Sequence, residues 1–406
     1  MKRSSSQPEA TLARLKQEHL TRSRRTVTDF GEPGSRVTLE ADGRKVVDFC
    51  SNDYLGLSRH PQVGEAMSQC AAQRGAGSAA SHLVSGHGYE HARLEEALAE
   101  FVGRERALLF STGYMANLAA ITTFADRGET VLLDRLSHAS LLDGALLSGA
   151  RLKRYAHADS DAADRMLVAE NTSVVATDGV FSMDGDLAPL PALAASSREH
   201  GAWLIVDDAH GLGVVGAHGR GSLEHFGLST DDVPLLIGTL GKALGSFGAF
   251  VAGSREVVEL LIHQGRSYIY TTALPQPVAA ATRKALEISE RESWRRARVH
   301  DLTRRFRAAA ARAGIPLTAS NTPIQPIVLG SSQSALRAQA ALWNEGYWVV
   351  AIRPPTVPRG SARLRVTLSA AHTEAQVDGL AAALGRAIAR ASDGVVLETS
   401  PRTVCE

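Results

Sequence analysis

The chain has 406 residues, of which 44% are hydrophobic and 21% charged, and its formal net charge is +1. This length favours about two or three domains, and the small net charge gives no argument for a nucleic-acid or membrane partner. No apolar run approaches the roughly 18 residues that cross a bilayer, and the polar N-terminus is not a signal peptide. The three cysteines have no metal-ligand spacing and suit a reducing, cytoplasmic compartment.

Residues 1–49 are predicted to form a separate N-terminal segment. A basic helix is predicted over Thr11–Arg25, and a β piece over Arg36–Val47 surrounds the turn Asp42-Gly43. The arginines at the end of the helix suit a solvated face or, alternatively, an arm that contacts an anionic substrate.

Residues 50–284 alternate short apolar runs with helical segments such as Glu90–Val102. The predicted strands are Ala107–Phe110, Val131–Leu133, Arg151–Tyr155, Ser173–Thr177, Trp203–Val206, Leu235–Thr239 and Gly248–Ala252. This alternation predicts an α/β domain with a largely parallel sheet covered by helices. Ligands of such sheets bind at the carboxyl ends of the strands.

Residues 285–391 predict a smaller α+β domain, and residues 392–406 a disordered tail. A long charged helix, Lys284–Ala313, comes first, and a helix from Thr373 begins with a capping box completed by Gln376. Between them lie the predicted strands Gln325–Leu329, Tyr347–Ile352 and Arg363–Leu368 and a helix at Ser334–Asn344.

Lys242 lies in an apolar, glycine-rich stretch, Leu235–Val251. Desolvation would lower the pKa of its amine, and a neutral amine is a nucleophile that forms Schiff bases with carbonyl groups. The structural alternative is a lysine that only caps a buried strand.

Polar residues follow several of the other strands. A turn at Ser111-Thr112-Gly113-Tyr114 feeds a helix, whose N-terminal N–H groups suit a phosphate. Asp207 and Asp208 end an apolar strand, where a carboxylate is costly unless it has a partner such as a protonated ring nitrogen. His138 follows a third strand and suits either a ring-stacking or a structural role.

Two other patterns are weaker. The glycines of residues 211–216 match GxGxxG, but no helix begins there, so we do not interpret them as a dinucleotide site. His82, His87 and His91 match no metal-ligand template, and we expect no metal.

A lysine, a carboxylate, a phosphate turn and a ring-stacking histidine at strand exits are together what pyridoxal 5′-phosphate needs.

The sequence resembles the α-oxoamine synthases, pyridoxal-phosphate enzymes of fold type I. The motifs that carry the resemblance are SNDYLGL (51–57), STGYMAN (111–117), SHASLLDG (137–144), DGVFSMDGD (178–186), VDDAHGLGVVG (206–216), GTLGKALGSFG (238–248), YIYTTALP (268–275) and RPPTVPRGSARLRVTLSAAHT (353–373). The resemblance implies a large domain with a seven-stranded, mostly parallel sheet and a smaller C-terminal domain. At two positions the chain departs from the family pattern: His82 stands where sister enzymes often carry Arg or Gly, and Asp178 where Glu is expected.

The resemblance also implies roles for single residues. Lys242 would hold the cofactor as a Schiff base and move the substrate α-proton, while Asp207 would pair with the ring nitrogen. The other implied cofactor contacts are His138 on the ring face, Ser182 and His210 near the phenolic oxygen, and Gly113, Tyr114, Thr239 and a partner subunit's Thr271 or Thr272 at the phosphate. The implied substrate contacts are Arg365 to the amino-acid carboxylate, Arg22 and Thr356 to the acyl group, and Asn52 and His138 in the pocket.

The implied reaction is a decarboxylative condensation of an amino acid with an acyl thioester, in a cytoplasmic homodimer whose active site lies at the subunit interface. The last motif favours L-alanine and a pimeloyl thioester, of CoA or of a carrier protein, in biotin biosynthesis. The alternatives are a sister enzyme of the glycine C-acetyltransferase, 5-aminolevulinate synthase or serine palmitoyltransferase type and, less favoured, a non-catalytic paralogue.

Overall fold

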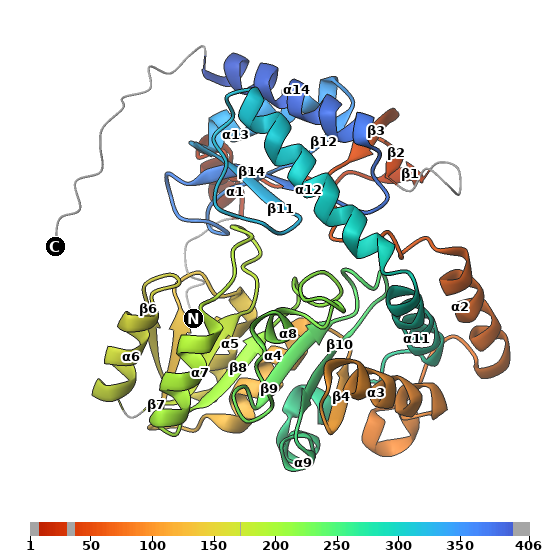
Figure 1. The fold of residues 1–406 in the computed structure, drawn as a ribbon, viewed down its shortest axis with the longest axis vertical. Helices are drawn as coiled ribbons and strands as arrows, with labels where there is room; N and C mark the ends of the chain where they lie inside the picture. Colours follow the sequence, from red (N-terminus) through yellow and green to blue (C-terminus); the bar gives the residue numbers. More distant parts are fainter. Residues whose placement is uncertain (1–7, 31–36, 171, 393–406) are drawn as a thin grey trace. The chain divides into compact units, whose positions relative to one another are not determined.

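The computed structural model describes residues 8–30, 37–170 and 172–392 (Figure 1). The chain forms two compact units, one of Asn52–His300 with Ser320–Pro323 and the other of the remaining residues. The N-terminal segment, which the sequence analysis kept separate, thus groups with the C-terminal part of the chain. The first unit also ends later than the predicted boundary at residue 284.

The first unit is built on a seven-stranded sheet with the order β4-β10-β9-β8-β7-β5-β6. Its strands are β4 (Arg106–Phe110), β5 (Thr130–Asp134), β6 (Arg151–Tyr155), β7 (Thr172–Asp178), β8 (Trp203–Asp207), β9 (Leu235–Thr239) and β10 (Ala249–Gly253). β10 alone runs opposite to the other six strands. The predicted fold, a seven-stranded and mostly parallel sheet, is therefore confirmed.

Both faces of this sheet are covered by helices, so its central strands bury successive side chains on both faces and not only on one. On β8, Ile205 packs in one core, whereas Leu204 and Val206 pack in the core on the opposite face. The first core includes residues of α4 (Gly113–Phe124), α5 (Ala139–Ser148), α9 (Arg255–Gln264) and α10 (Arg266–Ile269), and the second includes residues of α6 (Ser160–Ala169), α7 (Leu190–Glu199) and α8 (Ser222–Phe226).

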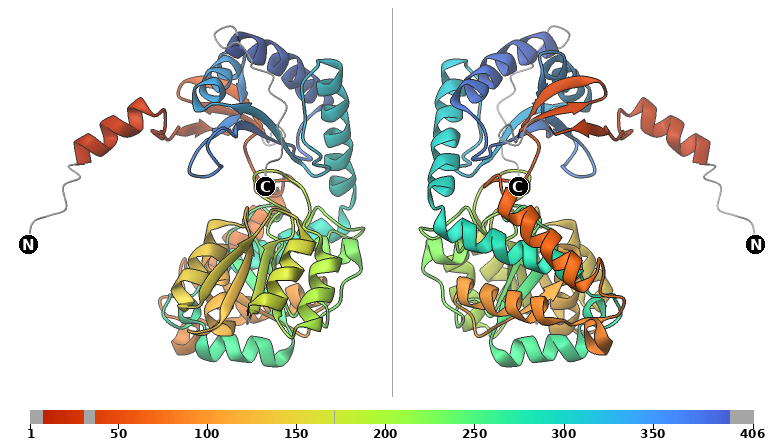
Figure 2. Two further views of the ribbon diagram at one scale, coloured as in Figure 1. Left: turned by 90° about the vertical axis from the view of Figure 1, so that its left-hand side faces the viewer. Right: turned by 90° about the vertical axis from the view of Figure 1, so that its right-hand side faces the viewer.

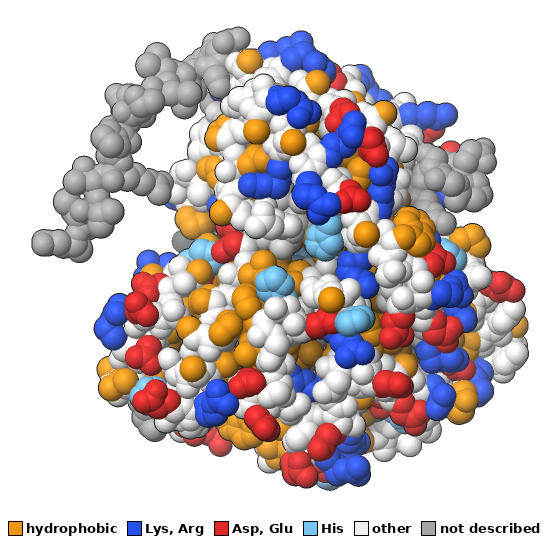
Figure 3. Space-filling view, viewed as in Figure 1, with side chains coloured by type: hydrophobic (Ala, Val, Ile, Leu, Met, Phe, Trp, Pro, Cys, Tyr) orange, Lys and Arg blue, Asp and Glu red, His pale blue; other side chains and the backbone are white. Residues whose placement is uncertain are grey.

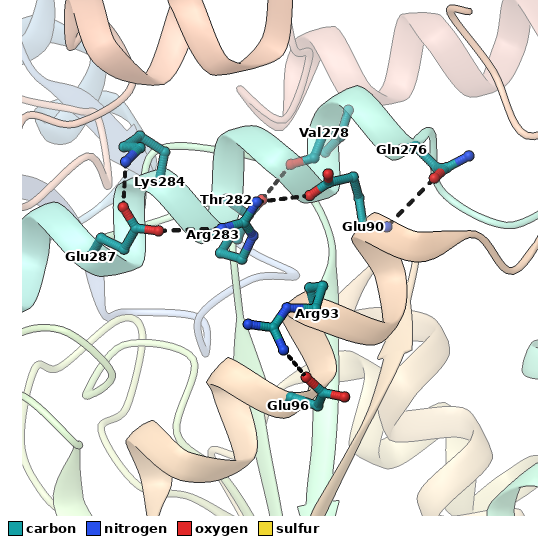
Figure 4. A network of polar contacts seen from close by, with 9 residues as sticks. All are labelled: Glu90, Arg93, Glu96, Gln276, Val278, Thr282, Arg283, Lys284 and Glu287. Atoms are coloured by element: carbon teal, nitrogen blue, oxygen red, sulfur yellow. Dashed lines mark hydrogen bonds and ion pairs between the residues drawn. The ribbon is translucent and has the colours of Figure 1, made fainter. Parts of the chain in front are cut away.

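The same unit also contains α2 (Pro61–Arg74), the short π-helix η1 (His82–Gly86), α3 (Tyr89–Val102) and α11 (Gln276–Arg291). Helix α11 packs against α2 and α3. Arg283 of α11 bonds Glu90 of α3 at 3.1 Å, beside further ion pairs within each helix (Figure 4). This network fixes α11 and α3 to each other.

The single helix predicted over Lys284–Ala313 is wrong, because the chain forms α11 and then α12 (Trp294–Arg312). Glu292 leaves the helical backbone with φ −103° and ψ 55°. Its carboxylate accepts a hydrogen bond from Arg295 Nε at 2.8 Å, which stabilises the break. Helical periodicity continues across this break in the sequence, so the pattern alone did not reveal it.

The second unit contains two sheets, one of β1 (Val27–Asp29), β2 (Thr38–Ala41), β3 (Arg44–Asp48) and β12 (Tyr347–Trp348), and one of β11 (Ile324–Gly330), β14 (Ala362–Thr367) and β13 (Val350–Ile352). Its helices include α13 (Ser332–Asn344) and α14 (Glu374–Ser392), seen from two sides in Figure 2. The strand predicted over Tyr347–Ile352 is divided between the two sheets. The predicted turn joins β2 and β3, with φ 49° at Asp42 and 72° at Gly43, as a two-residue hairpin requires.

Two helices of this unit can be compared with their predictions, one near each end of the chain. The capping box is confirmed, since Thr373 N donates to Gln376 Oε1 at 2.8 Å and Gln376 N donates to Thr373 Oγ1 at 3.2 Å. The N-terminal helix α1 (Pro8–Gln17) ends earlier than predicted, because His19 takes a left-handed conformation at φ 55°. Arg36 and the tail from 393 onwards lie outside the described residues.

The surface agrees with the small net charge of the chain. Basic and acidic side chains are interspersed on the face of the molecule seen in Figure 3. Among the described residues, we find no helix with the length and apolar character needed to cross a membrane.

Candidate active site

Lys242 lies in the loop that follows β9, and it is half-buried. Its Nζ is 2.8 Å from His210 Nε2, and the other ring nitrogen of His210 is 2.7 Å from the hydroxyl of Tyr54. The Tyr54 hydroxyl is also 3.2 Å from Asn52 Oδ1. The amine therefore ends a chain of polar groups, and it is not held in the purely apolar setting that the sequence predicted.

The hydroxyl of Tyr54 has one proton, so it donates to only one of its two partners, Asn52 Oδ1 at 3.2 Å or His210 Nδ1 at 2.7 Å. In either tautomer of His210, the Nε2 atom is the ring nitrogen that faces Lys242 Nζ. Tyr54 and His210 are buried, so water does not compete with these bonds. An amine beside an imidazole nitrogen is suited to proton transfer.

Asp207 ends β8 and is buried at 6% exposure. Its Oδ2 accepts a hydrogen bond from Asn117 Nδ2 at 2.6 Å, and its Oδ1 accepts from Ala209 N at 3.0 Å. The Asn117 amide also contacts Ser140 Oγ at 2.7 Å, and that hydroxyl contacts His138 Nδ1 at 2.6 Å. The contacts link two predicted site residues, Asp207 and His138, through two residues that the sequence analysis did not assign.

The electrostatics of His138 suit a neutral ring. Burial lowers its pKa, the charge of Lys242 lowers it further, and the charge of Asp207 partly opposes both. The backbone N–H of His138 donates to Asp178 Oδ2 at 2.8 Å. Burial, and after it the neighbouring Asp207 carboxylate, raises the pKa of Asp178 well above the usual value. Asp178, noted in the sequence only as a departure from Glu, therefore anchors the His138 loop.

The turn before α4 has the features of an anion site. Thr112 caps the helix by accepting a hydrogen bond from Met115 N at 3.2 Å, and Gly113 is the first helical residue. A Cβ added at Gly113 would meet only Ala249, at 4.0 Å, so packing within the protein does not require glycine there. Close approach of a ligand would account for it, as the predicted phosphate contact requires. Tyr114 is exposed and hydrogen-bonds Asp143.

Asp208 differs from its neighbour Asp207 in being structural. Burial raises its pKa to about 7, and its Oδ2 accepts from Ser222 N at 2.5 Å. A Cβ at Gly211 would lie 2.0 Å from Asp208 Oδ1, and one at Gly221 would lie 1.9 Å from Oδ2. The glycines around this loop thus make room for a carboxylate. No helix begins within 211–216, in keeping with our rejection of a dinucleotide site.

The remaining predicted cofactor contacts also belong to the first unit, and their contacts within the chain do not point to a phosphate or a ring. Thr239 ends β9 and its hydroxyl donates to Gly248 O at 3.1 Å. Ser182 is half-buried in the turn after β7. Thr271 donates to Ser267 O at 2.9 Å, whereas Thr272 is exposed and pairs with Ser81. Their roles at a phosphate stay predictions.

Three predicted substrate residues belong to the second unit. Arg22 Nη2 donates to Thr356 Oγ1 at 3.2 Å, so the two residues assigned to the acyl group do meet. Nearby, Arg353 donates to the Thr21 carbonyl at 3.0 Å, and the charge of Arg22 contributes to a lowered Arg353 pKa, after burial. Arg365 lies on β14 and is buried at 7% exposure.

The structure gathers the three histidines for which no metal template was found. Their ligand atoms lie within 4.8 Å of one another. His82 and His87 face each other with Nδ1 atoms 3.0 Å apart. His91, however, uses both ring nitrogens, accepting from Gly88 N at 2.9 Å and contacting Leu274 O at 2.6 Å. The ring nitrogens of His91 are thus already engaged by backbone groups, and the absence of a metal stays a prediction.

The site residues that the sequence analysis missed are Tyr54, Asn117 and Ser140. Each stands inside a motif that was quoted without a role for that residue. One signal was available: Asn117 follows Gly113 by four residues, so both lie on one face of α4, directly above the predicted phosphate turn.

Comparison with known proteins agrees with this arrangement. The family model for aminotransferase class I and II matches residues 44–384. An 8-amino-7-oxononanoate synthase of Stutzerimonas stutzeri is 59% identical over 374 residues, which cover 92% of this chain and 94% of the relative. One from Methylococcus capsulatus is 56% identical over 383 residues, covering 94% and 98%.

Solved structures extend the similarity. A serine palmitoyltransferase from S. paucimobilis has a TM-score of 0.89 at 30% identity, and the match covers 95% of this chain and 98% of that one. An 8-amino-7-oxononanoate synthase from Francisella tularensis has a TM-score of 0.75 at 31% identity, covering 85% and 98%.

The chain therefore belongs to the aminotransferase class I and II family, as an α-oxoamine synthase of fold type I. It is a pyridoxal-phosphate-dependent enzyme, and the predictions of family, fold type and cofactor are confirmed. Within this class, the relatives that share 56–60% of its residues are 8-amino-7-oxononanoate synthases.

The residues present fit this cofactor. Lys242 supplies the amine, Asp207 is a buried carboxylate held by two donors, and the space at Gly113 is open. Asn117 Oδ1 is buried and, among the described residues, has no hydrogen-bond partner, so this edge of the site can accept one more donor.

Proposed function

We propose that the protein is an 8-amino-7-oxononanoate synthase, which joins L-alanine to a pimeloyl thioester with loss of carbon dioxide in biotin biosynthesis. The observation that carries this proposal is the 56–60% identity to relatives of that name, over 84% or more of the chain. An amine, a buried carboxylate and a neutral histidine, brought together at strand exits, support it.

Pyridoxal phosphate, when bound, supplies a conjugated ring that delocalises the electrons left on the alanine Cα. The chain's own residues do the rest. Lys242 tethers the cofactor and takes the Cα proton, and His210 holds the amine from its Nε2 side. Asp207, fixed by Asn117, keeps the ring nitrogen protonated, because a carboxylate beside it favours the charged form. His138, whose pKa is lowered by burial, would lie against the ring as a neutral imidazole.

Substrate recognition falls to arginines of the second unit. We assign Arg365 to the alanine carboxylate, since a guanidinium presents a planar fork that matches a carboxylate. Arg22 and Thr356, joined at 3.2 Å, are assigned to the acyl substrate. Their cationic surroundings, which include Arg353, suit the terminal carboxylate of a pimeloyl chain. Asn52, at the end of the Tyr54 chain, is a further pocket residue.

We also propose that the enzyme works as a homodimer in the cytoplasm, with Thr271 or Thr272 of the partner subunit reaching the phosphate. The exposure of Thr272 supports this assignment. The expected acyl donor is a pimeloyl thioester of either CoA or a carrier protein.

The test is a substrate panel with the purified holoenzyme. L-Alanine, glycine and L-serine are each offered with pimeloyl-CoA and, in parallel, with pimeloyl-carrier protein, and release of the free thiol is measured. We expect L-alanine to give the highest kcat/KM. A clear preference for glycine or serine would instead assign the chain to a sister synthase. A protein that stays colourless with added pyridoxal phosphate would indicate a non-catalytic paralogue, and a yellow colour lost in Lys242→Ala would exclude one.

A further inference from the structure

His157 follows β6 and links two loops that carry predicted cofactor residues. Its Nδ1 is 3.0 Å from Asp134 Oδ1, and its Nε2 is 2.9 Å from Asp186 Oδ2. Asp134 ends β5 and begins the loop that leads to His138, while Asp186 closes the turn that contains Ser182. His157 lies outside every motif that carries the family resemblance.

The contacts require a charged ring. Both partners are carboxylates, so both ring nitrogens donate, and only the imidazolium form has two N–H groups. Burial opposes this charge, but the hydrogen bonds to Asp134 and Asp186 outweigh it and raise the pKa of His157 to about 10. The ring is 26% exposed and its edge packs on Phe181, with centroids 4.4 Å apart at 85°.

Asp134 needs this partner. Its side chain is fully buried, and a buried carboxylate without compensation costs several kcal/mol. The imidazolium and two backbone donors, Leu136 N at 2.7 Å and Ala158 N at 2.8 Å, supply that compensation. Thus the first residues of the His138 loop are bound to the same carboxylate as His157, and their geometry depends on it.

The Ser182 turn, on the other side of His157, is also held by hydrogen bonds. Phe181 N donates to Asp186 O at 2.9 Å and Gly185 N donates to Phe181 O at 2.8 Å, which closes the turn around Ser182. Gly185 O accepts from Ser320 and Thr322, each at 2.9 Å. The Asp186 side chain reaches out of this turn to His157. At the opposite end, His138 N bonds Asp178 Oδ2.

We propose that His157 is a positioning residue, whose imidazolium fixes the His138 loop and the Ser182 turn relative to each other and so sets where both meet the cofactor. The Asp178 contact ties the two loops at the strand ends, and the His157 bridge ties them further out. Removing the bridge leaves the Asp178 contact at the strand ends, so the outer parts of the two loops lose their polar connection to each other. A displacement of about 1 Å at a reacting group is enough to cost on the order of 100-fold in rate.

The test compares His157→Gln, Asp186→Asn and the double variant with His200→Gln. His200 is a matched control, since its side chain is 27% exposed and pairs with a single carboxylate, Asp164 at 3.7 Å. For each variant, the Kd of pyridoxal phosphate for the apo-protein, the visible circular dichroism of the bound cofactor and the Tm are measured. Ring-nitrogen NMR shifts of His157 in the wild-type holoenzyme report its protonation at pH 8.

We expect His157→Gln to raise the Kd about tenfold or more and to change the visible dichroism, which reports ring orientation. The double variant should be no worse than His157→Gln, because both changes break one bridge, and independent sites would instead add. His200→Gln should leave the Kd and the dichroism unchanged.

Wild-type Kd and dichroism in His157→Gln, or additive losses in the double variant, would overturn the proposal, as would a singly protonated His157 at pH 8. If His157→Gln does not fold, Asp186→Asn still decides, because it keeps the bond between His157 and Asp134. Since the readout is cofactor binding, failure here would leave the substrate assignment untouched.

Discussion

Asn117→Ala tests whether the orientation of Asp207 determines cofactor affinity. The Asn117 side chain is 1% exposed, and its Nδ2 contacts both Asp207 Oδ2 at 2.6 Å and Ser140 Oγ at 2.7 Å. The substitution removes one of the two donors that hold the carboxylate, and leaves only Ala209 N on the other oxygen. The carboxylate can then rotate away from the position that faces the ring nitrogen.

The size of the effect follows from the contact that is lost. A hydrogen bond to a charged group contributes about 1.5–3 kcal/mol. If a similar amount is lost between Asp207 and the ring nitrogen, the Kd of pyridoxal phosphate rises about 10-fold to 100-fold, because about 1.4 kcal/mol corresponds to tenfold. The apo-protein should also lose roughly 2 kcal/mol of stability.

The assay is a titration of apo-protein with pyridoxal phosphate followed by absorbance, together with a thermal melt of each apo-protein. Thr122→Val is the matched control: Thr122 lies on the same helix, and its hydroxyl donates to Leu118 O at 2.7 Å with no link to Asp207. It should bind the cofactor as the wild type does. If Asn117→Ala melts earlier but binds with wild-type affinity, then Asn117 is structural only and our account of Asp207 is refuted.

Three further predictions follow. The contribution of His157 to stability, whose folded pKa is raised to about 10, is full below the ordinary histidine pKa of about 6.5 and is lost as the pH rises through about 10. The destabilisation of His157→Gln should therefore shrink between pH 6.5 and 10 in chemical denaturation; a difference that grows over this range would contradict it. Gly221→Ala should cost at least about 2 kcal/mol of folding stability, because φ is +99° and the new Cβ would lie 1.9 Å from Asp208 Oδ2. Gly201→Ala is the control and should cost less, since its φ is +68° and the space around it is open. Equal losses of stability in chemical denaturation would show that the clash at Gly221 is relieved. Arg365→Ala should raise the alanine KM about tenfold or more while leaving cofactor affinity unchanged. Arg363 is the other arginine of β14, and if Arg363→Ala has this effect instead, the assignment of Arg365 to the alanine carboxylate is wrong.

Most strands of the large unit could be predicted because they are short apolar runs between helical segments, and several end at a polar cluster. β6 and β9 have the bounds that the sequence predicted, and β8 differs from its prediction only by Asp207 at its end. Helix ends were harder, because they depend on single backbone conformations. The break at Glu292 and the left-handed His19 leave no mark in the hydrophobic periodicity.

The site residues also fall into two groups, those that can be predicted from local sequence and those that cannot. Lys242, Asp207 and His138 have chemistry that stands out at a strand exit, so they could be found one at a time. Asn117, Tyr54 and His157 act through contacts between elements far apart in sequence: Asn117 and Asp207 are 90 residues apart, and Tyr54 and His210 are 156 apart. No local pattern encodes such a pairing, since an asparagine on α4 has the same neighbours in sequence whether or not β8 lies beneath it. The groups that react can therefore be predicted from residue type and position. The groups that aim them become visible only when the sheet brings its strand ends together.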